Sequence, residues 1–241
     1  MKVYAITDIG RVRALNEDSY YLPLEGERFC AVADGMGGHN AGEVASAMAV
    51  QAFSEYMRGI DPITGQALYG AVAQANEQVY RAARENDGMS GMGTTFSALA
   101  WQDGNALLAH VGDSRVYLVR QGAIMQLTTD HTLVEEMVRK GMLTPREARF
   151  HPRRNIITRA LGTDPDVAID IVQLVARPGD VFFLCSDGMT NYVEEREILR
   201  TAVGDGDWQD KLKHLVDEAL DNGGADNITA LFAVIGEEAA R

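Results

Sequence analysis

One pattern occurs twice in this chain and constrains its fold more than any other feature: an apolar run that ends in Asp-Gly-Met. The two runs cover residues 29–36 and 181–189 and contain Asp34 and Asp187. Continuous apolar runs of this length are typical of strands that are covered on both faces. The three glycines within four residues after Asp34 permit positive φ and leave room for a ligand close to the main chain. The pattern predicts that a buried strand presents the Asp34 carboxylate to a ligand.

Two further aspartates lie at the ends of other expected strands. Asp113 follows Gly112 between two short strands, and Asp226 opens the last expected strand. One Asp-Gly pair alone would be an ordinary turn, but four such carboxylates spread over the whole chain make sense if the fold gathers them. Carboxylate and carbonyl oxygens suit Mg²⁺ or Mn²⁺, whereas Zn²⁺ favours His and Cys. The five histidines show no metal-ligand spacing.

The hydrophobic periodicity predicts an α+β protein with antiparallel sheets. Most strands follow one another through short turns such as Asp103-Gly104 and Gln121-Gly122, and parallel strands would each need a crossover helix. The expected strands cover residues 3–9, 20–24, 29–33, 94–101, 106–111, 115–120, 123–126, 167–174, 181–185 and 228–235. The expected helices cover residues 40–58, 65–86 and 208–219, with two short helices between 129 and 155. Asn40 with Glu43, and Thr144 with Glu147, predict capping boxes.

The chain is expected to form one domain over residues 1–236, with a frayed tail at 237–241. Its 22 Lys and Arg against 35 Asp and Glu give a net charge of −13, which opposes binding to nucleic acid or to an anionic membrane. Carboxylates that repel one another in the empty protein become favourable once divalent cations lie among them. The acidic excess and the expected cations are thus compatible.

The two cysteines indicate a reducing compartment. Cys30 and Cys185 both lie in apolar runs, where a free Cys behaves as a small hydrophobe. A cysteine phosphatase requires an Arg six residues after its catalytic Cys. Here Met36 and Asn191 occupy those two positions, so this mechanism is excluded for the chain. The start of the chain lacks the pattern of a signal peptide, and no window approaches 18 uninterrupted apolar residues. We therefore expect a cytoplasmic protein without a membrane segment.

Two polar segments each leave two interpretations open. Glu17 and Asp18 could be a solvated loop end or could approach Asp34. A basic run near the expected short helices could face an anionic ligand or could be a solvated connector that balances neighbouring acids. That run contains Arg146, Arg149, His151, Arg153, Arg154 and Arg159, with Glu147 as the one acidic residue among them.

Seven short motifs, taken together, resemble the metal-dependent Ser/Thr protein phosphatases of the type 2C family, in particular its compact bacterial members. They occur in the family's order and span about residues 3–235. The motifs are Asn16-Glu-Asp18, Val32-Ala-Asp-Gly-Met-Gly-Gly-His39, Gly91-Met-Gly-Thr-Thr95, His110-Val-Gly-Asp-Ser-Arg115, Thr129-Asp-His131, Ser186-Asp-Gly188 and Gly224-Ala-Asp-Asn227.

The resemblance implies a four-layer α-β-β-α sandwich of two antiparallel sheets flanked by helix pairs. It also implies a helical flap near the active site, here about residues 131–155. By the same resemblance the chain hydrolyses phosphoserine and phosphothreonine in proteins with two core Mn²⁺ or Mg²⁺ ions and a third. A water that bridges two ions would attack in line, without a phosphoenzyme intermediate. A monomer whose partners include a cognate Ser/Thr kinase is expected.

Residue roles follow from the matching positions. Asp34 would bridge both core ions, the Gly35 carbonyl would bind the second, and Asp187 and Asp226 would bind the first. Asp113, with Asp187, matches the site of the third ion, and Asp18 would orient a water. Glu17 lies where some members have a direct metal ligand and many bacterial members have Gln. Arg13 matches the Arg that binds the substrate phosphate.

The chain departs from the family pattern at the general acid. Members from higher organisms have a His directly after the Asp-Gly pair, whereas this chain has Met36 there and His39 three residues later. His39 or a metal-bound water could protonate the leaving group. Two alternatives to catalysis are a silent regulatory domain of the same fold and a structural calcium site. Silent relatives usually lose core carboxylates, and here each of them is present.

Overall fold

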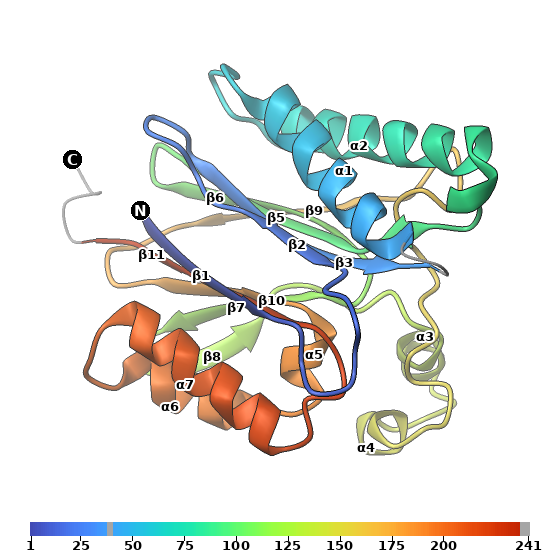
Figure 1. Cartoon of the computed structure of the whole chain (residues 1–241). Helices are drawn as coiled ribbons and strands as arrows, with labels where there is room; N and C mark the ends of the chain where they lie inside the picture. The colour runs from blue at the N-terminus through green and yellow to red at the C-terminus, as the bar shows by residue number, and fades with distance from the viewer. Residues whose placement is uncertain (38–40, 237–241) are drawn as a thin grey trace.

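The computed structural model describes residues 1–37 and 41–236 and consists of two antiparallel sheets stacked between two helix pairs (Figure 1). The expected four-layer α-β-β-α architecture is therefore confirmed. The expected tail at 237–241, the Asn40 cap and the candidate acid His39 lie outside the described residues.

The two sheets have different strand orders. One sheet runs β1-β11-β10-β7-β8, with bounds Lys2–Asp8, Ile228–Val234, Val181–Cys185, Arg115–Arg120 and Ala123–Gln126. The other runs β2-β3-β5-β6-β9, with bounds Asp18–Tyr21, Phe29–Met36, Phe96–Gln102, Asn105–Val111 and Asp170–Val175. The short strand β4, Gly93–Thr94, pairs with the end of β3. Every strand pairing is antiparallel, as the short turns predict.

Each helix pair covers the outer face of one sheet. The helices α1, Ala41–Met57, and α2, Gly65–Glu85, cover the sheet of β3, and α6, Glu195–Val203, and α7, Trp208–Asp221, cover the sheet of β10 (Figure 1). Two short helices, α3, Leu133–Arg139, and α4, Pro145–Arg149, stand beside the sandwich. The short helix α5, Asp187–Thr190, directly follows β10.

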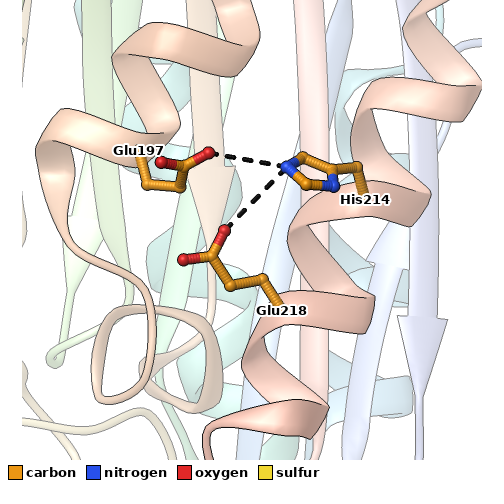
Figure 2. Close-up of side chains that lie close together, drawn as sticks. All are labelled: Glu197, His214 and Glu218. Carbon is orange, nitrogen blue, oxygen red and sulfur yellow. Dashed lines mark hydrogen bonds and ion pairs between the residues drawn. The ribbon is translucent and has the colours of Figure 1, made fainter.

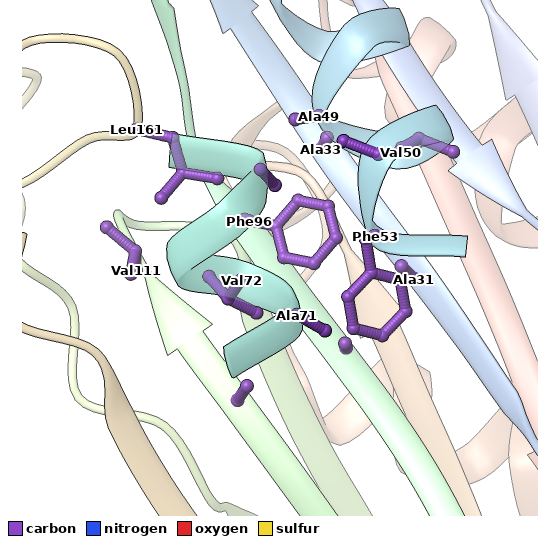
Figure 3. Close-up of a cluster of buried hydrophobic side chains, with 14 of the residues drawn as sticks. Ala31, Ala33, Ala49, Val50, Phe53, Ala71, Val72, Phe96, Val111 and Leu161 are labelled. Carbon is purple, nitrogen blue, oxygen red and sulfur yellow. The ribbon is translucent and has the colours of Figure 1, made fainter. Parts of the chain in front are cut away.

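Aromatic side chains join α1 to its sheet. Phe53 of α1 packs edge-on against Phe29 with the ring centroids 5.7 Å apart, and it lies 5.1 Å from Phe96 of β5. Small residues of α1 and α2 surround these rings, so the helices approach the sheet closely (Figure 3). Burial of apolar surface of this kind is the main stabilising contribution to such a layer.

Side-chain alternation along β3 explains why an acidic residue can follow an apolar strand. Phe29, Ala31 and Ala33 face the α1–α2 layer, whereas Cys30 and Val32 face the other sheet. Asp34 is the next position of the second series. The strand therefore directs its carboxylate into the space between the two sheets, where the apolar packing ends.

The structure corrects several element boundaries. The strand β3 continues through Asp34 to Met36, because its end pairs with β2 and β4. The expected strand 94–101 is divided into β4 and β5 at Thr95, whose backbone N–H donates to the Asp34 carbonyl. The expected strand 167–174 begins only at Asp170. Helix α6 was not predicted from the sequence.

Local signals at turns and caps are confirmed where the structure describes them. Asp103 and Gly104 both have positive φ, 50° and 74°, as a tight hairpin turn requires. Thr144 and Glu147 form the expected capping box at the start of α4. In the described part of the chain, no helix is long and apolar enough to cross a membrane.

The aromatic contact in Figure 3 leads to a stability prediction. Phe53→Ala leaves a cavity under α1, where the side chain is 0% exposed, and should lower the free energy of unfolding by about 3–5 kcal/mol. The matched control is Phe150→Ala, because Phe150 is 75% exposed and its loss should change stability by less than about 0.5 kcal/mol. Denaturant titration measures both, and equal effects would contradict the proposed packing role.

Candidate metal centre

The aspartates expected to be gathered by the fold do meet at one end of the sandwich, between the sheets. Asp18 of β2 and Asp34 of β3 are direct partners across an antiparallel pair. Asp187 follows β10, Asp226 precedes β11, and Asp113 lies in the turn between β6 and β7. Both sheets thus contribute, and the residues come from segments more than 200 positions apart.

The main chain at Asp34 is held rigidly. Its N–H donates to the Thr95 hydroxyl at 2.9 Å, and its carbonyl accepts from the Thr95 N–H at 2.9 Å and from the Thr94 hydroxyl at 2.9 Å. The next residue, Gly35, donates its N–H to the Glu17 carbonyl at 3.0 Å. A carboxylate on so fixed a backbone has few positions available.

Gly35 is required for space and not for a positive φ. A Cβ at this position would lie 2.1 Å from the Gly42 carbonyl oxygen and 2.5 Å from that of Glu17. Gly35 and Gly37 do not have positive φ, so the expected glycine turn directly after Asp34 is wrong at these two positions. The extended β3 places the start of α1 and the Glu17 segment against the backbone instead.

Asp18 is buried within the cluster and not at a solvated loop end. It is 9% exposed, and its Oδ2 accepts from the Ser186 hydroxyl at 2.8 Å. The Ser186 hydroxyl in turn accepts the Thr229 N–H at 3.0 Å. The other carboxylate oxygen, Oδ1, has no partner among the described residues. This resolves the open interpretation of Asp18 in favour of a position beside Asp34.

Asp113, like Asp18, has a carboxylate oxygen without a hydrogen-bond partner among the described residues. It is 8% exposed, and its Oδ1 is buried without a hydrogen-bond partner in the part of the chain that the structure describes. Asp187 is better satisfied, because its Oδ2 accepts from Asn191 Nδ2 at 3.0 Å. Buried acceptors are normally hydrogen-bonded. Two orphaned oxygens in one acidic site therefore indicate a missing electropositive partner.

Electrostatic repulsion supports the same conclusion. Burial, followed by the charges of Asp18, Asp187, Asp113 and Asp226, raises the pKa of Asp34 well above its usual value. Burial also raises the pKa of Asp18 to about 7, of Asp113 to about 8 and of Asp187 to about 6. So many adjacent carboxylates cannot all ionise without compensation. Hard divalent cations fit this all-oxygen donor set.

Arg13 and Glu17 lie at the edge of the cluster. The Arg13 guanidinium binds Asp226 through Nε and Nη2, both at 2.9 Å, and Nη1 lies 3.4 Å from Glu17 Oε2. The Arg13 side chain is 46% exposed, whereas that of Glu17 is 15% exposed. Burial raises the pKa of Glu17 despite the nearby guanidinium. Glu17 thus shares the environment of the other acidic groups.

Sequence reasoning did not assign roles to the residues that support these carboxylates. Asn227 accepts the Glu17 N–H at 2.8 Å and donates to the Ile9 and Leu15 carbonyls at 2.9 Å each. It therefore fixes the segment that carries Arg13 and Glu17. Ser186 and Thr95 similarly hold Asp18 and Asp34. For Ser186 and Asn227 the available signal was a polar residue directly beside an Asp inside a motif, whereas Thr95 belongs to a motif without an Asp.

A groove of about 820 Å³ leads from the cluster to the short helices α3 and α4. Asp113 and Asp187 line its inner end, and Arg149, Arg154 and Arg196 line it further out. Part of the basic run thus faces a groove that reaches the carboxylates. Arg159 instead pairs with Asp170 at 3.2 Å.

A second acidic group lies on the outer helices α6 and α7, and its members do not line this groove. Figure 2 shows Glu197 and Glu218 around His214, whose Nε2 is 3.5 Å from Glu197 Oε1 and 3.9 Å from Glu218 Oε2. Arg200 also binds Glu197, through Nε at 2.9 Å. The Arg200 guanidinium already compensates the charge of Glu197, the more buried of the two carboxylates. We therefore interpret Glu197, His214 and Glu218 as a surface ion-pair network.

Comparisons with known proteins indicate the same family as the sequence motifs. The sequence profile described as protein phosphatase 2C matches residues 11–230. The protein phosphatase PhpP of Streptococcus pneumoniae strain D39 is 37% identical over 245 residues, which covers 100% of both chains.

Solved structures show the same fold. The Mycobacterium tuberculosis serine/threonine phosphatase PstP/Ppp superposes with a TM-score of 0.91 at 37% identity, over 98% of this chain and 99% of that chain. The catalytic domain of PstP in complex with two manganese ions superposes with a TM-score of 0.89 at 36% identity, over 98% of each chain.

The raised pKa values predict an unusual pH dependence for the metal-free protein. Above about pH 7.5, one unit above the usual pKa of His, the buried histidines are neutral both folded and unfolded, but folded Asp113, with a pKa of about 8, and part of folded Asp18, with a pKa of about 7, still hold protons that the unfolded chain has lost. Stability should therefore fall as the pH rises from about 7.5 to 8.5. In chelator, Tm should drop by about 2–4 °C per kcal/mol lost.

Mn²⁺ bound among these carboxylates would replace their protons, so its stabilising effect on Tm should be larger at pH 8.5 than at pH 7.5. The control is Asp113→Asn, which removes one of these titrating groups and should make the decline in chelator shallower. A Tm that stays constant or rises with pH in chelator would contradict the predicted burial of these protonated carboxyls.

Proposed function

Because this chain belongs to the protein phosphatase 2C family and is a serine/threonine protein phosphatase, we propose that its carboxylate cluster binds two core divalent cations, Mn²⁺ or Mg²⁺, and a third. The family is metal-dependent, and the related PstP catalytic domain holds two manganese ions. The observation that carries the proposal is the cluster of buried aspartates, two of them with orphaned oxygens. Such groups are stable together when cations lie among them.

The proposed ligands divide between the two sheets. Asp34 would bridge the core ions, with the Gly35 carbonyl on one and Asp187 and Asp226 on the other. Asp113, together with Asp187, would hold the third ion. Glu17 lies beside Arg13 at the rim, where it could complete the set through direct or water-mediated contact. When bound, two such cations supply an activated water and stabilise the oxygens of a phosphoryl displacement.

The chain's own residues would position this reaction. The Ser186 hydroxyl holds one oxygen of Asp18, so the free Oδ1 can orient a water that approaches the phosphorus. Arg13 is held by Asp226 and remains 46% exposed, so it can turn its guanidinium toward a substrate phosphate. His39 stays a prediction as the donor of a proton to the leaving Ser or Thr oxygen.

Direct hydrolysis without a phosphoenzyme is supported by the state of the thiols. Cys30 and Cys185 are both free and fully buried. Burial raises the pKa of Cys30 to about 12 and also raises that of Cys185, so neither supplies a thiolate nucleophile near neutral pH. Water is thus the proposed acceptor of the phosphoryl group.

We propose phosphoserine and phosphothreonine proteins as substrates, including a cognate kinase, and a monomeric cytoplasmic enzyme. The groove beside α3 and α4 is the proposed binding place for the protein substrate, and its Arg154 could contact an acidic segment, whereas Arg149 and Arg196 already pair with Glu194 at 3.9 and 2.9 Å. The absence of nucleic-acid partners, expected from the net charge of −13, stays a prediction.

Asp34→Asn tests the metal centre. The substitution keeps the shape of the side chain but removes the charge shared by both core ions. Activity on a phosphothreonine peptide with added Mn²⁺ should fall at least about 10²-fold, as for other groups that stabilise the transition state electrostatically. The matched control, Asp166→Asn, changes an exposed carboxylate and should retain full activity. Activity that survives both Asp34→Asn and chelator would sink the proposal.

Arg13→Ala tests phosphate binding. Removing the guanidinium should lower kcat/KM about 10- to 100-fold, chiefly through a higher KM, and should weaken product inhibition by phosphate. Arg11→Ala is the control, because Arg11 binds the Leu220 carbonyl and Asp221 on the outer surface and should not affect KM. An unchanged KM in the Arg13 variant would remove this residue from the substrate site.

A further inference from the structure

The turn that carries Asp113 is fastened from one side by a single residue, His131. The Gly112 N–H donates to His131 Nδ1 at 3.0 Å, and the His131 N–H donates to the Gly112 carbonyl at 2.7 Å. Gly112 has a φ of 109°, and a Cβ there would lie 2.6 Å from Thr95 Cβ. The turn is therefore packed against Thr95, which directly precedes β5, on one side and hydrogen-bonded to His131 on the other.

These contacts determine the protonation state of the imidazole. A backbone N–H can only donate, so Nδ1 of His131 must hold a free lone pair and the ring proton must lie on Nε2. Nε2 lies 3.1 Å from Asp170 Oδ2, which accepts this proton. Arg159 lies 3.3 Å from Nε2 and directs Nη1 to Asp170 Oδ1 at 3.2 Å. His131 is 5% exposed, and burial lowers its pKa, which favours the neutral ring.

A second buried histidine holds the ring in place. His110 packs on His131 with the centroids 4.9 Å apart and an interplanar angle of 37°. Its Nδ1 lies 2.9 Å from the Ser97 hydroxyl, and its Nε2 lies 3.2 Å from the Thr129 carbonyl. His110 therefore fills the space behind His131, so the ring cannot easily turn away from Gly112.

His131 is also attached to the base of the segment that carries α3 and α4. Its carbonyl accepts the Thr158 N–H at 2.7 Å, and the next residue, Thr132, bridges Ile157. One residue thus joins the Asp113 turn to both ends of this helical segment. A displacement of His131 would move the turn and the groove wall together.

We propose that His131 is a positioning residue whose neutral imidazole fixes the Gly112–Asp113 turn and thereby the Asp113 ligand. The inference rests on the proposed metal centre, because Asp113 is assigned there to a third cation. His131 contacts neither substrate nor cation. Loss of its Nδ1 acceptor would leave the buried Gly112 N–H unsatisfied and the Asp113 carboxylate free to shift, which weakens the cation site that depends on Asp113.

Two amide substitutions separate the two ends of the imidazole. In His131→Asn the side-chain oxygen lies near the Nδ1 position and can still accept from Gly112. In His131→Gln the longer amide reaches toward the Nε2 position and Asp170, but nothing accepts from Gly112. Calorimetric titration with Mn²⁺ measures binding directly, and Asp113→Asn identifies the binding event that depends on Asp113.

For that event we expect His131→Gln to weaken Mn²⁺ binding roughly 10- to 100-fold, and His131→Asn to remain within about threefold of the wild type. Equal losses in both variants, or wild-type binding in His131→Gln, would overturn the inference. Wild-type protein that binds no Mn²⁺ would overturn the metal centre as well, so the two failures are distinguishable.

A measurement on the wild type covers the case in which His131→Gln does not fold. The ¹⁵N chemical shifts of the His131 ring in chelator should show an unprotonated Nδ1 and a protonated Nε2. A protonated Nδ1 would exclude the bond from Gly112 and overturn the inference directly.

Discussion

Mutual repulsion among buried carboxylates is the constraint on which the rest of this structure depends. Asp34 lies within reach of four other aspartates, and its pKa is raised by burial and by each of them. A chain that gathers so much negative charge must either keep protons on these groups or supply cations in their place. Its sheets, glycines and hydroxyl groups can all be understood as means of holding this unfavourable cluster together.

The space between the sheets changes character along its length. Over most of the strands it is filled by apolar side chains such as Val32, Leu108 and Phe182, which stabilise the sandwich. At one end the same inward positions become polar, and Asp34, Ser186 and their neighbours take over. Asp18 and Asp34 lie within regular strands, and Asp113, Asp187 and Asp226 each lie two residues from a strand end, so the sheets fix the positions of the polar end as well. A site that must keep charges at fixed positions benefits from this arrangement.

Much of the site could be predicted from the sequence, because short-range signals marked it. The positions of aspartates at the ends of apolar strands, near glycine, identified Asp34, Asp113, Asp187 and Asp226, and the family resemblance added Arg13. Sequence reasoning failed where the cause was a contact between distant segments. Gly35 is needed because the start of α1 passes 2.1 Å from where its Cβ would lie, and no local pattern reports such an approach. Helix α6 was missed although it is longer than α3 and α4, because its N-cap residue is Glu194, whose side chain makes no cap hydrogen bond, whereas α3 and α4 begin at capping threonines.

By itself the sequence determined which residues carry charge, where strands and helices form, and that oxygen ligands would favour hard divalent cations. These properties depend on side-chain chemistry and on local periodicity. Only the tertiary structure decided that Asp18 is buried beside Asp34, that Arg13 binds Asp226 and that His131 fastens the Asp113 turn. Each of these depends on strand register and sheet stacking, which set distances between residues far apart in the chain, and such distances have no counterpart in local sequence.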